Sequence, residues 1–460
     1  MTPVVVVGNG PVGQTTALLL ARWGVPAVVL DSRAERDAIG SRSICQQRDV
    51  LDIWRSVGAG EQITAEGLTW RTARTFYQDT ELFAVDLPST GTLPPFVNLS
   101  QSRTEEILDS WIARQPLIDV RWDHHVTGLD QDADGVTVTC VNGQVLRASY
   151  VVLCAGARAD ALRSALGVTF EGRSFDDQFL ICDISADLPG WAHERRFYFD
   201  PPWNPGRQVL IHPCPGSTFR IDWQVPADYS AETDDLDGRI RQIIGDAEYS
   251  VIWKSVYRFH SRVASRMRVG RVLLAGDCAH LMAPFGARGL NSGVADAENA
   301  AWKIAFVLQG KSAGDLLETY HVERHAAALE NLAVTTETMN FLVPQDDAQR
   351  RRRLSVLERA RHDPSVHSEV NSGRLSAPFP YRSSPLTSGT HPAAGRLVPE
   401  RCRSFCRDGV QVIRESAALG VRPGEMWVIR PDAYVAAVAT SSAELNAALS
   451  SLLLVSVYQG

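Results

Sequence analysis

Residues 270–310 read GRVLLAGDCAHLMAPFGARGLNSGVADAENAAWKIAFVLQG, and this stretch decides the fold that the rest of the chain completes. It begins with a short apolar run at 272–275, which predicts a buried strand, and Asp277 ends that run with a carboxylate. Pro284 and Gly289 follow in a predicted loop whose backbone can approach a flat ligand closely. After Asn291 the apolar residues recur at helical spacing. The stretch predicts a strand, a ligand-binding loop and a helix; the alternative is a strand–loop–helix unit of an ordinary α/β core.

The N-terminus carries a second motif that favours the ligand-binding interpretation. An apolar run at 4–7 leads into Gly8, Gly10 and Gly13, a helical pattern follows, and a second apolar run ends at Asp31. Strand, glycines, helix and terminal acid together form the βαβ fingerprint of a dinucleotide site. Asp31 is placed to bind an adenosine ribose hydroxyl, and its charge repels a 2′-phosphate. We therefore expect bound FAD or NAD rather than NADP; the alternative is a glycine-rich turn without a ligand.

The composition limits the classes of function. A net charge of −7 over 460 residues gives no electrostatic reason to expect nucleic acid or an anionic membrane as a partner. Eight cysteines are mostly scattered singly, which predicts reduced thiols in a cytoplasmic protein, and the closest pair, Cys402 and Cys406, is expected to be structural. No apolar run reaches membrane-spanning length, and the N-terminus reads as a strand rather than a signal peptide.

The rest of the chain differs from these two motifs in its pattern of apolar and aromatic residues. Residues 170–262 hold aromatic side chains in short alternating runs, which predict a mostly antiparallel sheet that is either a plain core or the wall of a site for a flat organic substrate. Residues 120–129, 136–141 and 144–148 predict a small antiparallel meander, and 316–339 and 349–361 predict helices. His321 and His325 have metal-ligand spacing but no third ligand of known motif, so no metal site is predicted.

On these motifs the chain resembles the single-component flavoprotein aromatic hydroxylases of the 4-hydroxybenzoate hydroxylase type, in the hydroxyphenylpropionate and polyketide hydroxylase branch. The resemblance covers residues 3–345. It implies an FAD site and assigns cofactor contacts by motif; Arg42 is added as a candidate phosphate contact. The expected FAD-binding residues are Gly8, Gly10, Pro11, Val12, Gly13, Asp31, Ser32, Arg33, Arg42, Gln101, Val126, Gly156, Asp277, Pro284, Gly289, Leu290 and Asn291.

The implied fold is α/β (α+β): an FAD-binding βαβ Rossmann-like domain interleaved with an antiparallel-sheet substrate domain, plus a truncated thioredoxin-like C-terminal piece. The expected FAD domain is discontinuous (1–169 and 263–345, with inserted segments of substrate sheet), the substrate sheet is 170–262, a helix and linker occupy 346–392, and the thioredoxin-like region is 393–460. The sequence departs from the family at Ala155, where Asp is usual before Gly156. That motif is associated with FAD and NADPH contacts, so the departure bears on NADPH use.

The implied activity is hydroxylation of a phenolic or polycyclic aromatic substrate. NADPH or NADH reduces FAD, O2 adds at flavin C4a, and the hydroperoxide delivers one oxygen to the ring. Substrate contacts are expected among Arg196, Tyr198, His212, Arg220, Trp223 and Phe285, with no catalytic residue assigned, and the high arginine and alanine content is compatible with a secondary-metabolite substrate. The rivals are an epoxidase, a Baeyer–Villiger oxygenase or a flavin oxidase on the same fold, and a flavin-binding protein without catalysis. The oligomeric state stays open, with a homodimer among the alternatives.

Overall fold

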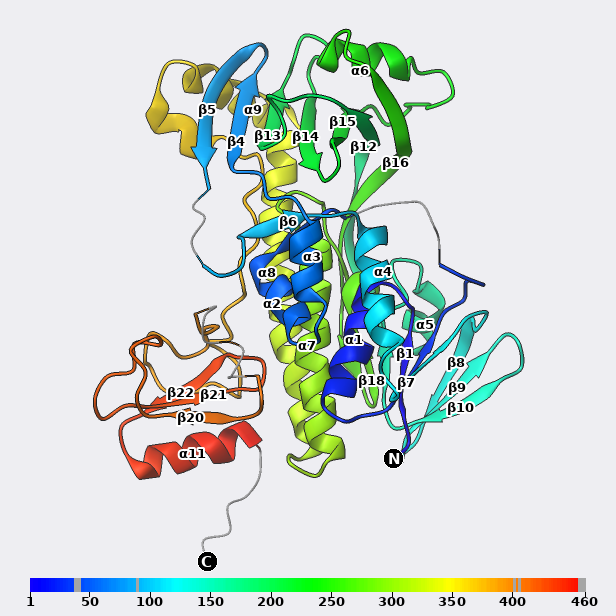
Figure 1. Cartoon of the computed structure of the whole chain (residues 1–460), viewed down its shortest axis with the longest axis vertical. Coiled ribbons are helices and arrows are strands. Elements are labelled where there is room, and N and C mark those ends of the chain that lie inside the picture. Colours follow the sequence, from blue (N-terminus) through cyan, green and yellow to red (C-terminus); the bar gives the residue numbers. More distant parts are fainter. Residues whose placement is uncertain (37–42, 88–90, 400–402, 404–406, 454–460) are drawn as a thin grey trace, which may run out of the picture.

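The computed structural model describes residues 1–36, 43–87, 91–399, 403 and 407–453. Two long helices, α7 (Arg288–Leu308) and α8 (Glu318–Leu342), run through the middle of the molecule, with a large sheet at one end and a small C-terminal unit beside the other (Figure 1). None of the helices in these described ranges is long and apolar enough to cross a bilayer.

A six-stranded, mostly parallel sheet holds both motifs that the sequence singles out. Its order is β17-β18-β11-β1-β2-β7, and only β17 runs antiparallel to its neighbour. Its strands are β1 (Val4–Val7), β2 (Ala27–Leu30), β7 (Ile118–Arg121), β11 (Val151–Leu153), β17 (Arg268–Val269) and β18 (Val272–Leu274). The central strands are buried along their whole length, which explains why they read as continuous apolar runs rather than alternating ones.

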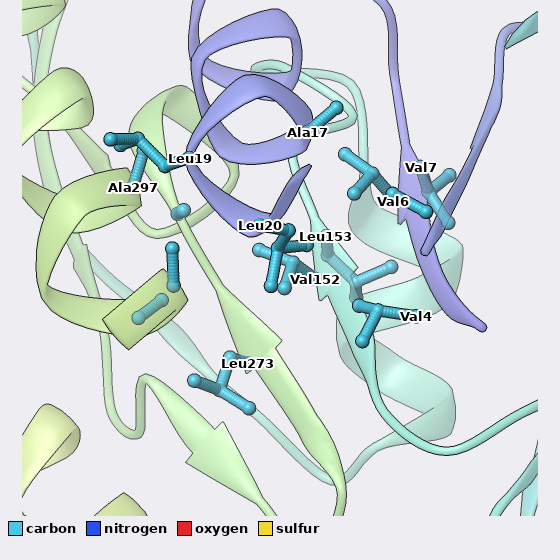
Figure 2. Packing of buried hydrophobic residues seen from close by; sticks show 14 of the residues in the cluster. Val4, Val6, Val7, Ala17, Leu19, Leu20, Val152, Leu153, Leu273 and Ala297 are labelled. Atoms are coloured by element: carbon cyan, nitrogen blue, oxygen red, sulfur yellow. The ribbon is translucent and has the colours of Figure 1, made fainter. Parts of the chain in front are cut away.

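Helix α1 (Pro11–Arg22) packs between this sheet and α7. Figure 2 shows Leu19 directed toward Ala297 of α7 and Leu20 toward Leu153 of β11, and all four side chains belong to one buried cluster. The other helices around this sheet are α2 (Arg48–Arg55), α3 (Gly60–Glu66), α4 (Gln101–Ile112) and α5 (Asp160–Ala165). The packing of α1 on β1 and α7 fixes the glycine turn relative to the second motif.

The expected meander exists, with one correction. The sequence grouped residues 120–129 into one strand, but Asp123 adopts φ of 56° and breaks it. Residues before the break form β7 of the parallel sheet, and β8 (Val126–Gln131) starts after it. The meander is therefore β8, β9 (Val136–Cys140) and β10 (Val145–Ala148), in the order β10-β9-β8.

The predicted aromatic sheet has eight strands in the order β19-β16-β12-β15-β14-β13-β4-β5. Its strands are β4 (Thr72–Tyr77), β5 (Thr80–Asp86), β12 (Phe170–Ala186), β13 (Glu194–Phe199), β14 (Gln208–Cys214), β15 (Thr218–Val225), β16 (Tyr249–Ala264) and β19 (His280–Leu281). All pairings are antiparallel except that of β13 with β4. The strands β4 and β5 come from the N-terminal part of the chain, so the sheet is built from segments far apart in sequence.

This large sheet has two differently covered faces because successive side chains of a strand point to opposite sides. On the outer face, Leu180, Trp223 and their neighbours pack with α6 (Leu236–Ile244) in one cluster. On the inner face, Phe179 and Phe197 cluster with Phe285, which belongs to the loop before α7. The inner face is thus the one turned toward the predicted ligand loop.

The remaining segments include those of the C-terminal unit. They are β3 (Cys45–Gln47), β6 (Phe96–Asn98), α9 (Asp347–Ala360), β20 (Gln411–Ile413), β21 (Met426–Ile429), β22 (Val435–Ala439), α11 (Ser442–Leu453) and the 3-10 turns η1 (Gly276–Cys278), η2 (Gly314–Leu317) and η3 (Pro364–Glu369). The C-terminal unit is a three-stranded antiparallel sheet, β20-β21-β22, with α11 beside it. Its apolar side packs on Trp302 and Phe306 of α7. The thioredoxin-like assignment of this unit stays a prediction.

Candidate functional site

Three turns meet at one edge of the parallel sheet. The strands β1, β11 and β18 are parallel neighbours, so their carboxyl ends lie at the same edge, within about 10 Å of one another across two strand spacings. These ends lead into the glycine turn at Gly8, the turn at Gly156 and the turn at Asp277. The first and third turns touch, because a Cβ placed on Gly276 would lie 3.0 Å from Cγ2 of Val12. One extended ligand can therefore contact both sequence motifs.

The glycine turn has the shape that a pyrophosphate needs. Gly8 has φ of 108°, and a Cβ on Gly8 or Gly13 would collide with the backbone of Cys154 or of Gly8, respectively. A Cβ on Gly10 would meet no atom within 4 Å, so space is open above it. Pro11 is the first residue of α1, whose first turn directs backbone N–H groups toward this space. Close packing at two glycines and open space at the third fit an FAD pyrophosphate.

Asp31 sits at the end of β2 and is only 6% exposed. Its Oδ2 accepts from the N–H of Asn9 at 2.7 Å, and the Arg33 guanidinium donates to both carboxylate oxygens at 3.0 Å. Burial alone would raise the pKa of Asp31, but these bonds hold its pKa below the usual value. A ribose hydroxyl must share the carboxylate with Arg33, whose side chain is one-third exposed and can move aside. Ser32 lies between them, and Arg42 lies outside the described residues.

A buried ionic chain, missed from the sequence, holds the Asp277 turn. Asp296 of α7 accepts from the N–H of Gly276 at 3.0 Å, bonds Nε2 of His280 at 2.7 Å, and accepts from Nε of Arg324 at 2.6 Å. The Arg324 guanidinium also donates to the hydroxyl of Tyr381, in the linker to the C-terminal unit, at 2.8 Å. The sequence analysis missed Asp296 because it lies about 100° round the helix from Ala297, off the apolar face that the periodicity predicts.

A second cation joins the turn at Gly156 to the turn at Asp277. Arg163 of α5 is 2% exposed and donates to the carbonyl of Cys278 at 3.0 Å and to that of Ala157 at 3.1 Å. Gly156 has φ of 72°, a conformation that favours glycine. The segment that departs from the family at Ala155 is therefore firmly tied to the Asp277 turn.

The loop before α7 is shorter than the sequence suggested. The helix begins at Arg288, so Gly289, Leu290 and Asn291 form its first turn instead of continuing the loop. Asn291 joins this turn to β3, because its Oδ1 accepts from the N–H of Gln47 at 2.9 Å and its Nδ2 donates to the carbonyl of Cys45 at 2.9 Å. A Cβ on Gly289 would meet no atom within 4 Å, so the helix start has open space beside it.

The other expected cofactor contacts belong to the loop before α7, to α4 and to β8, and their contact with a cofactor stays a prediction. Pro284 is exposed and Phe285, next to it, is buried against the large sheet. Gln101 is the first residue of α4, and its Nε2 donates to Oε1 of Glu105 at 2.8 Å. Val126 opens β8 and is buried.

The expected substrate residues divide between the two faces of the large sheet. His212 and Arg220 are cross-strand neighbours on the inner face, where Arg220 also pairs with Asp183 at 2.7 and 2.8 Å. Phe285 contacts the same face through Phe197, at 6.5 Å between ring centroids.

The other three expected residues lie on the outer face. Arg196 pairs with Glu194 at 2.9 Å, Tyr198 stacks on Phe76 at 4.5 Å, and Trp223 packs with the α6 cluster. Arg196, Tyr198 and Trp223 therefore point away from the ligand loop, because successive side chains of a strand lie on opposite faces of the sheet.

Two inner-face residues that the sequence did not single out complete this surface. Asp222 lies opposite Ile181 and Leu210, and Arg195 lies next to Arg196 on β13, on the face of Phe197. Burial raises the pKa of Asp222 to about 7 and lowers the pKa of Arg195 to about 10. Burial and the two nearby guanidinium groups lower the pKa of His212, so its imidazole is neutral.

A cavity of about 700 Å³ lies elsewhere, between α8, α9 and the segment that follows η3. Val334, Phe341, Arg353 and His367 are among its lining residues. Of the described residues, none that the sequence predicts to bind cofactor or substrate lines it. It borders the inner face of the large sheet, because its lining residue Ser372 accepts from Arg195 at 3.2 Å and a Cβ on Gly373 would lie 2.8 Å from Cβ of Phe285.

Comparison with known proteins agrees with this geometry. The family described as FAD binding domain matches residues 1–335. A 3-(3-hydroxy-phenyl)propionate/3-hydroxycinnamic acid hydroxylase from Mycobacterium sp. (strain JLS) is 32% identical over 342 residues, which is 72% of this chain and 59% of that protein. The chain therefore spans about three fifths of the length of the curated relatives it matches.

Solved structures share the fold. The p-nitrophenol 4-monooxygenase from Pseudomonas putida DLL-E4 aligns with a TM-score of 0.70 and 27% identity, covering 82% of this chain and 99% of that one. The flavin-dependent monooxygenase PieE, solved in complex with FAD and substrate, aligns with a TM-score of 0.80 and 20% identity over 98% of this chain and 99% of that one. Since the family match covers most of the chain and its glycine and Asp277 turns form one edge, the chain belongs to the FAD binding domain family.

Proposed function

We propose that the protein is an FAD-dependent monooxygenase that hydroxylates a phenolic ring with NADH or NADPH and O2. The observation that carries the proposal is the contact between the glycine turn and the Asp277 turn at the edge of the parallel sheet. The loop before α7, which holds Phe285, packs on the inner face of the aromatic-rich sheet. The family match and the hydroxylase activities named for the relatives support it.

In this proposal the protein holds the cofactor along the sheet edge. Gly10, Pro11, Val12 and Gly13 surround the pyrophosphate, Asp31 takes the adenosine ribose, and Asp277 takes the ribityl chain. Ser32, Arg33, Gln101, Val126, Gly156, Pro284, Gly289, Leu290 and Asn291 complete the proposed contacts, with Arg42 as a further phosphate contact. Bound FAD supplies the chemistry that takes a hydride from NAD(P)H and activates O2. The side chains bind, orient and exclude water.

The inner face supplies the substrate wall. Phe179, Phe197 and Phe285 keep water from the reacting ring. Arg195 is a buried cation, and among the described residues no carboxylate lies within ion-pair distance of it; its guanidinium donates to the carbonyl of Ser372 at 3.2 Å. A buried cation without a counter-ion favours a ligand that brings one. We therefore propose a phenol with an acidic substituent, as in the hydroxyphenylpropionate named for the relatives.

The division into domains is part of the proposal. The FAD domain comprises residues 1–169 and 263–345, of which β4 and β5 join the sheet of the substrate domain, residues 170–262. The helix and linker occupy residues 346–392, and the thioredoxin-like region starts at residue 393. A homodimer is part of the proposal, and a cytoplasmic location is proposed from the six scattered cysteines of the described residues, which are free; Cys402 and Cys406 lie outside those residues.

The test is anaerobic mixing of FAD-loaded protein with NADH or NADPH, with and without 3-(3-hydroxyphenyl)propionate, followed by O2 and product analysis. We expect bleaching of flavin absorbance that the phenol accelerates, and a ring-hydroxylated product. Hydrogen peroxide as the sole product would indicate a flavin oxidase, and no bleaching with either nucleotide would indicate a flavin-binding protein without catalysis. A product oxidised outside the ring would indicate an epoxidase or a Baeyer–Villiger oxygenase.

A glycine pair tests the proposed cofactor site separately. A Cβ on Gly10 meets no atom within 4 Å, so Gly10→Ala should fold normally but lose FAD affinity at least tenfold, because its methyl group points into the pyrophosphate space. Gly314→Ala, equally unhindered in η2, is the matched control and should bind FAD normally. Equal FAD affinity of the two variants would contradict the proposed pyrophosphate position.

A further inference from the structure

The inner face of the large sheet carries a row of charges whose pairing is incomplete. Asp183, Arg220 and His212 face one another across β12, β15 and β14. Asp183 holds Arg220 through two hydrogen bonds, which neutralise that guanidinium. Asp222, the next residue of β15 on the same face, is therefore left beside a cation that is already engaged.

Among the described residues, none forms a hydrogen bond or ion pair with the Asp222 side chain. Its Oδ1 is shielded from solvent and accepts no hydrogen bond from any described residue, and the same is true of Nδ1 of His212. Both side chains nevertheless keep accessible surface, while the neighbours of each along its strand are buried. A buried acceptor that no group satisfies costs free energy unless a ligand supplies the donor.

The place of Asp222 relates it to the ligand loop. Leu210 lies opposite Asp222, Phe197 lies opposite Leu210, and the ring of Phe197 contacts Phe285 beside Pro284. Two cross-strand steps amount to about 10 Å, which is within the span of a substituted aromatic ring. A ligand held against Phe285 can present a hydroxyl group to Asp222.

We propose that Asp222 is a catalytic residue that accepts the proton of the substrate's phenolic hydroxyl. The proposal rests on the proposed aromatic hydroxylation. The proton moves from the phenolic oxygen to the carboxylate, which gives a phenolate and a neutral carboxylic acid, and no electrons are transferred. The product then leaves and the carboxylic acid returns its proton to solvent.

The surrounding charges favour Asp222 over His212 as the acceptor. The titratable groups that face Asp222 are Arg220 on its own strand, Asp183 on β12, His212 and Cys214 on β14 and Arg195 on β13, and Cys45 of β3 lies beside Arg195 and Cys214. The two guanidinium groups disfavour a proton on His212 but stabilise a phenolate once it forms. A carboxylate whose pKa lies near the working pH is the better general base.

The experiment compares two ligands that differ only in the hydroxyl group, 3-(3-hydroxyphenyl)propionate and 3-phenylpropionate. Binding to FAD-loaded protein is measured by calorimetry between pH 5.5 and pH 8.5. Affinity for the hydroxylated ligand should rise about tenfold with a midpoint near pH 7, because ionised Asp222 accepts a stronger, charge-assisted hydrogen bond than the neutral acid does. Affinity for 3-phenylpropionate should stay constant over the same range.

Asp222→Asn should remove the rise, and Asp228→Asn, an exposed carboxylate just after the same strand, should retain it. A tenfold rise that survives in Asp222→Asn, in protein that still hydroxylates the phenol, overturns the role of Asp222 alone. Wild-type protein that binds neither ligand, or that binds both with one pH profile and forms no hydroxylated product, overturns the proposed function together with it.

Discussion

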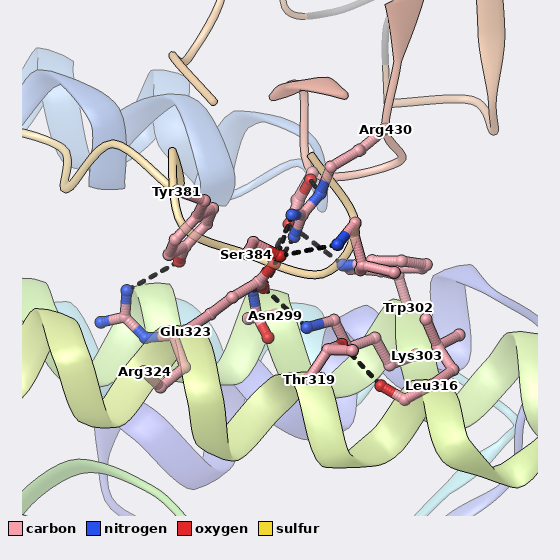
Figure 3. Close-up of polar contacts among 12 residues, drawn as sticks. Asn299, Trp302, Lys303, Leu316, Thr319, Glu323, Arg324, Tyr381, Ser384 and Arg430 are labelled. Atoms are coloured by element: carbon pink, nitrogen blue, oxygen red, sulfur yellow. Dashed lines mark hydrogen bonds and ion pairs between the residues drawn. The ribbon is translucent and has the colours of Figure 1, made fainter. Parts of the chain in front are cut away.

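Two clusters of buried charge differ in how completely they are paired. In the first, which we call the α8 network, Glu323 of α8 accepts from Lys303 of α7 at 2.7 Å and from Arg430 of the C-terminal unit at 2.5 and 2.9 Å (Figure 3). Arg430 also donates to Asp432 at 2.9 and 2.7 Å, and Ser384 donates to Glu323 at 2.5 Å. Two cations meet two anions, and every charged group has an opposite partner.

The second cluster is the row of Asp183, Arg220, His212, Asp222 and Arg195 on the inner face of the large sheet. Only Asp183 and Arg220 form an ion pair there. The Oδ1 of Asp222 and the Nδ1 of His212 lack hydrogen-bond partners within the described ranges. Burial shifts the pKa values of side chains in both clusters, so burial alone does not distinguish the two clusters.

The contrast separates structural charge from charge kept for a ligand. A fully satisfied buried network fixes how elements pack, and the α8 network fixes the C-terminal unit on α7 and α8. An unsatisfied buried network lowers the stability of the folded protein. Such a loss is expected at a binding surface, where the missing partners come from a ligand. Substitutions should therefore have opposite effects on stability in the two clusters.

The largest effect is expected from Glu323→Gln. The substitution keeps the shape but leaves Lys303 and Arg430 with Asp432 as their only anion, and the free energy of unfolding should fall by about 3–5 kcal/mol. Lys303 moderates the loss, because burial already lowers its pKa to about 8 and it can release its proton. Urea unfolding of FAD-loaded protein measures the change.

The matched control is Glu318→Gln at the start of the same helix. Glu318 forms partly exposed ion pairs with Arg266 and Arg268. Such pairs contribute at most about 1 kcal/mol. Similar losses for the two variants would show that the buried pairing has no special weight.

A smaller effect of opposite sign is expected from Asp222→Asn. The folded protein holds the pKa of Asp222 at about 7, above its ordinary value of 3.8, so ionisation costs stability as pH rises between these values. At pH 8 the variant should be more stable than the wild type by on the order of 2 kcal/mol, and near pH 4 the two should be equal. Urea midpoints at both pH values test this, and a destabilised variant at pH 8 would place Asp222 with the structural charges.

Part of this contrast could be predicted from the sequence. The two motifs at Gly8 and Asp277 were found because continuous apolar runs, glycines and terminal acids are local patterns, and the sheet edge that joins them follows from parallel pairing. Alternation along β15 also held a usable signal. Arg220 was singled out, and the period of two places Asp222 on its face and Trp223 on the other.

The rest depends on pairing that local patterns do not encode. In β13, Arg195 and Arg196 are adjacent and aromatic residues follow on both faces, so only the register with β4 and β14 decides which arginine faces the ligand loop. The bond between Asp296 and Arg324 joins two helices across 28 residues, and Glu323 meets Arg430 across 107. The sequence shows such charges but not their partners.

The smallest effect is expected where the structural charges reach the proposed cofactor site. Tyr381 accepts from Arg324, and Arg324 holds Asp296, which fixes the N–H of Gly276 beside Asp277. Removing the hydroxyl leaves one N–H of a buried guanidinium without its partner and loosens this chain by about 1 kcal/mol.

Tyr381→Phe should therefore weaken FAD binding about fivefold, which flavin fluorescence titration measures. Tyr434→Phe is the control, since its ring packs on Tyr381 at 4.4 Å and no hydrogen bond of its hydroxyl is found in the described part of the chain. Unchanged FAD affinity in Tyr381→Phe, with lower stability, would confine Arg324 and Asp296 to a structural role. Weaker binding in Tyr381→Phe alone would show that the C-terminal linker positions the Asp277 turn, so that the buried ion pair of Arg324 and Asp296 also serves a ligand.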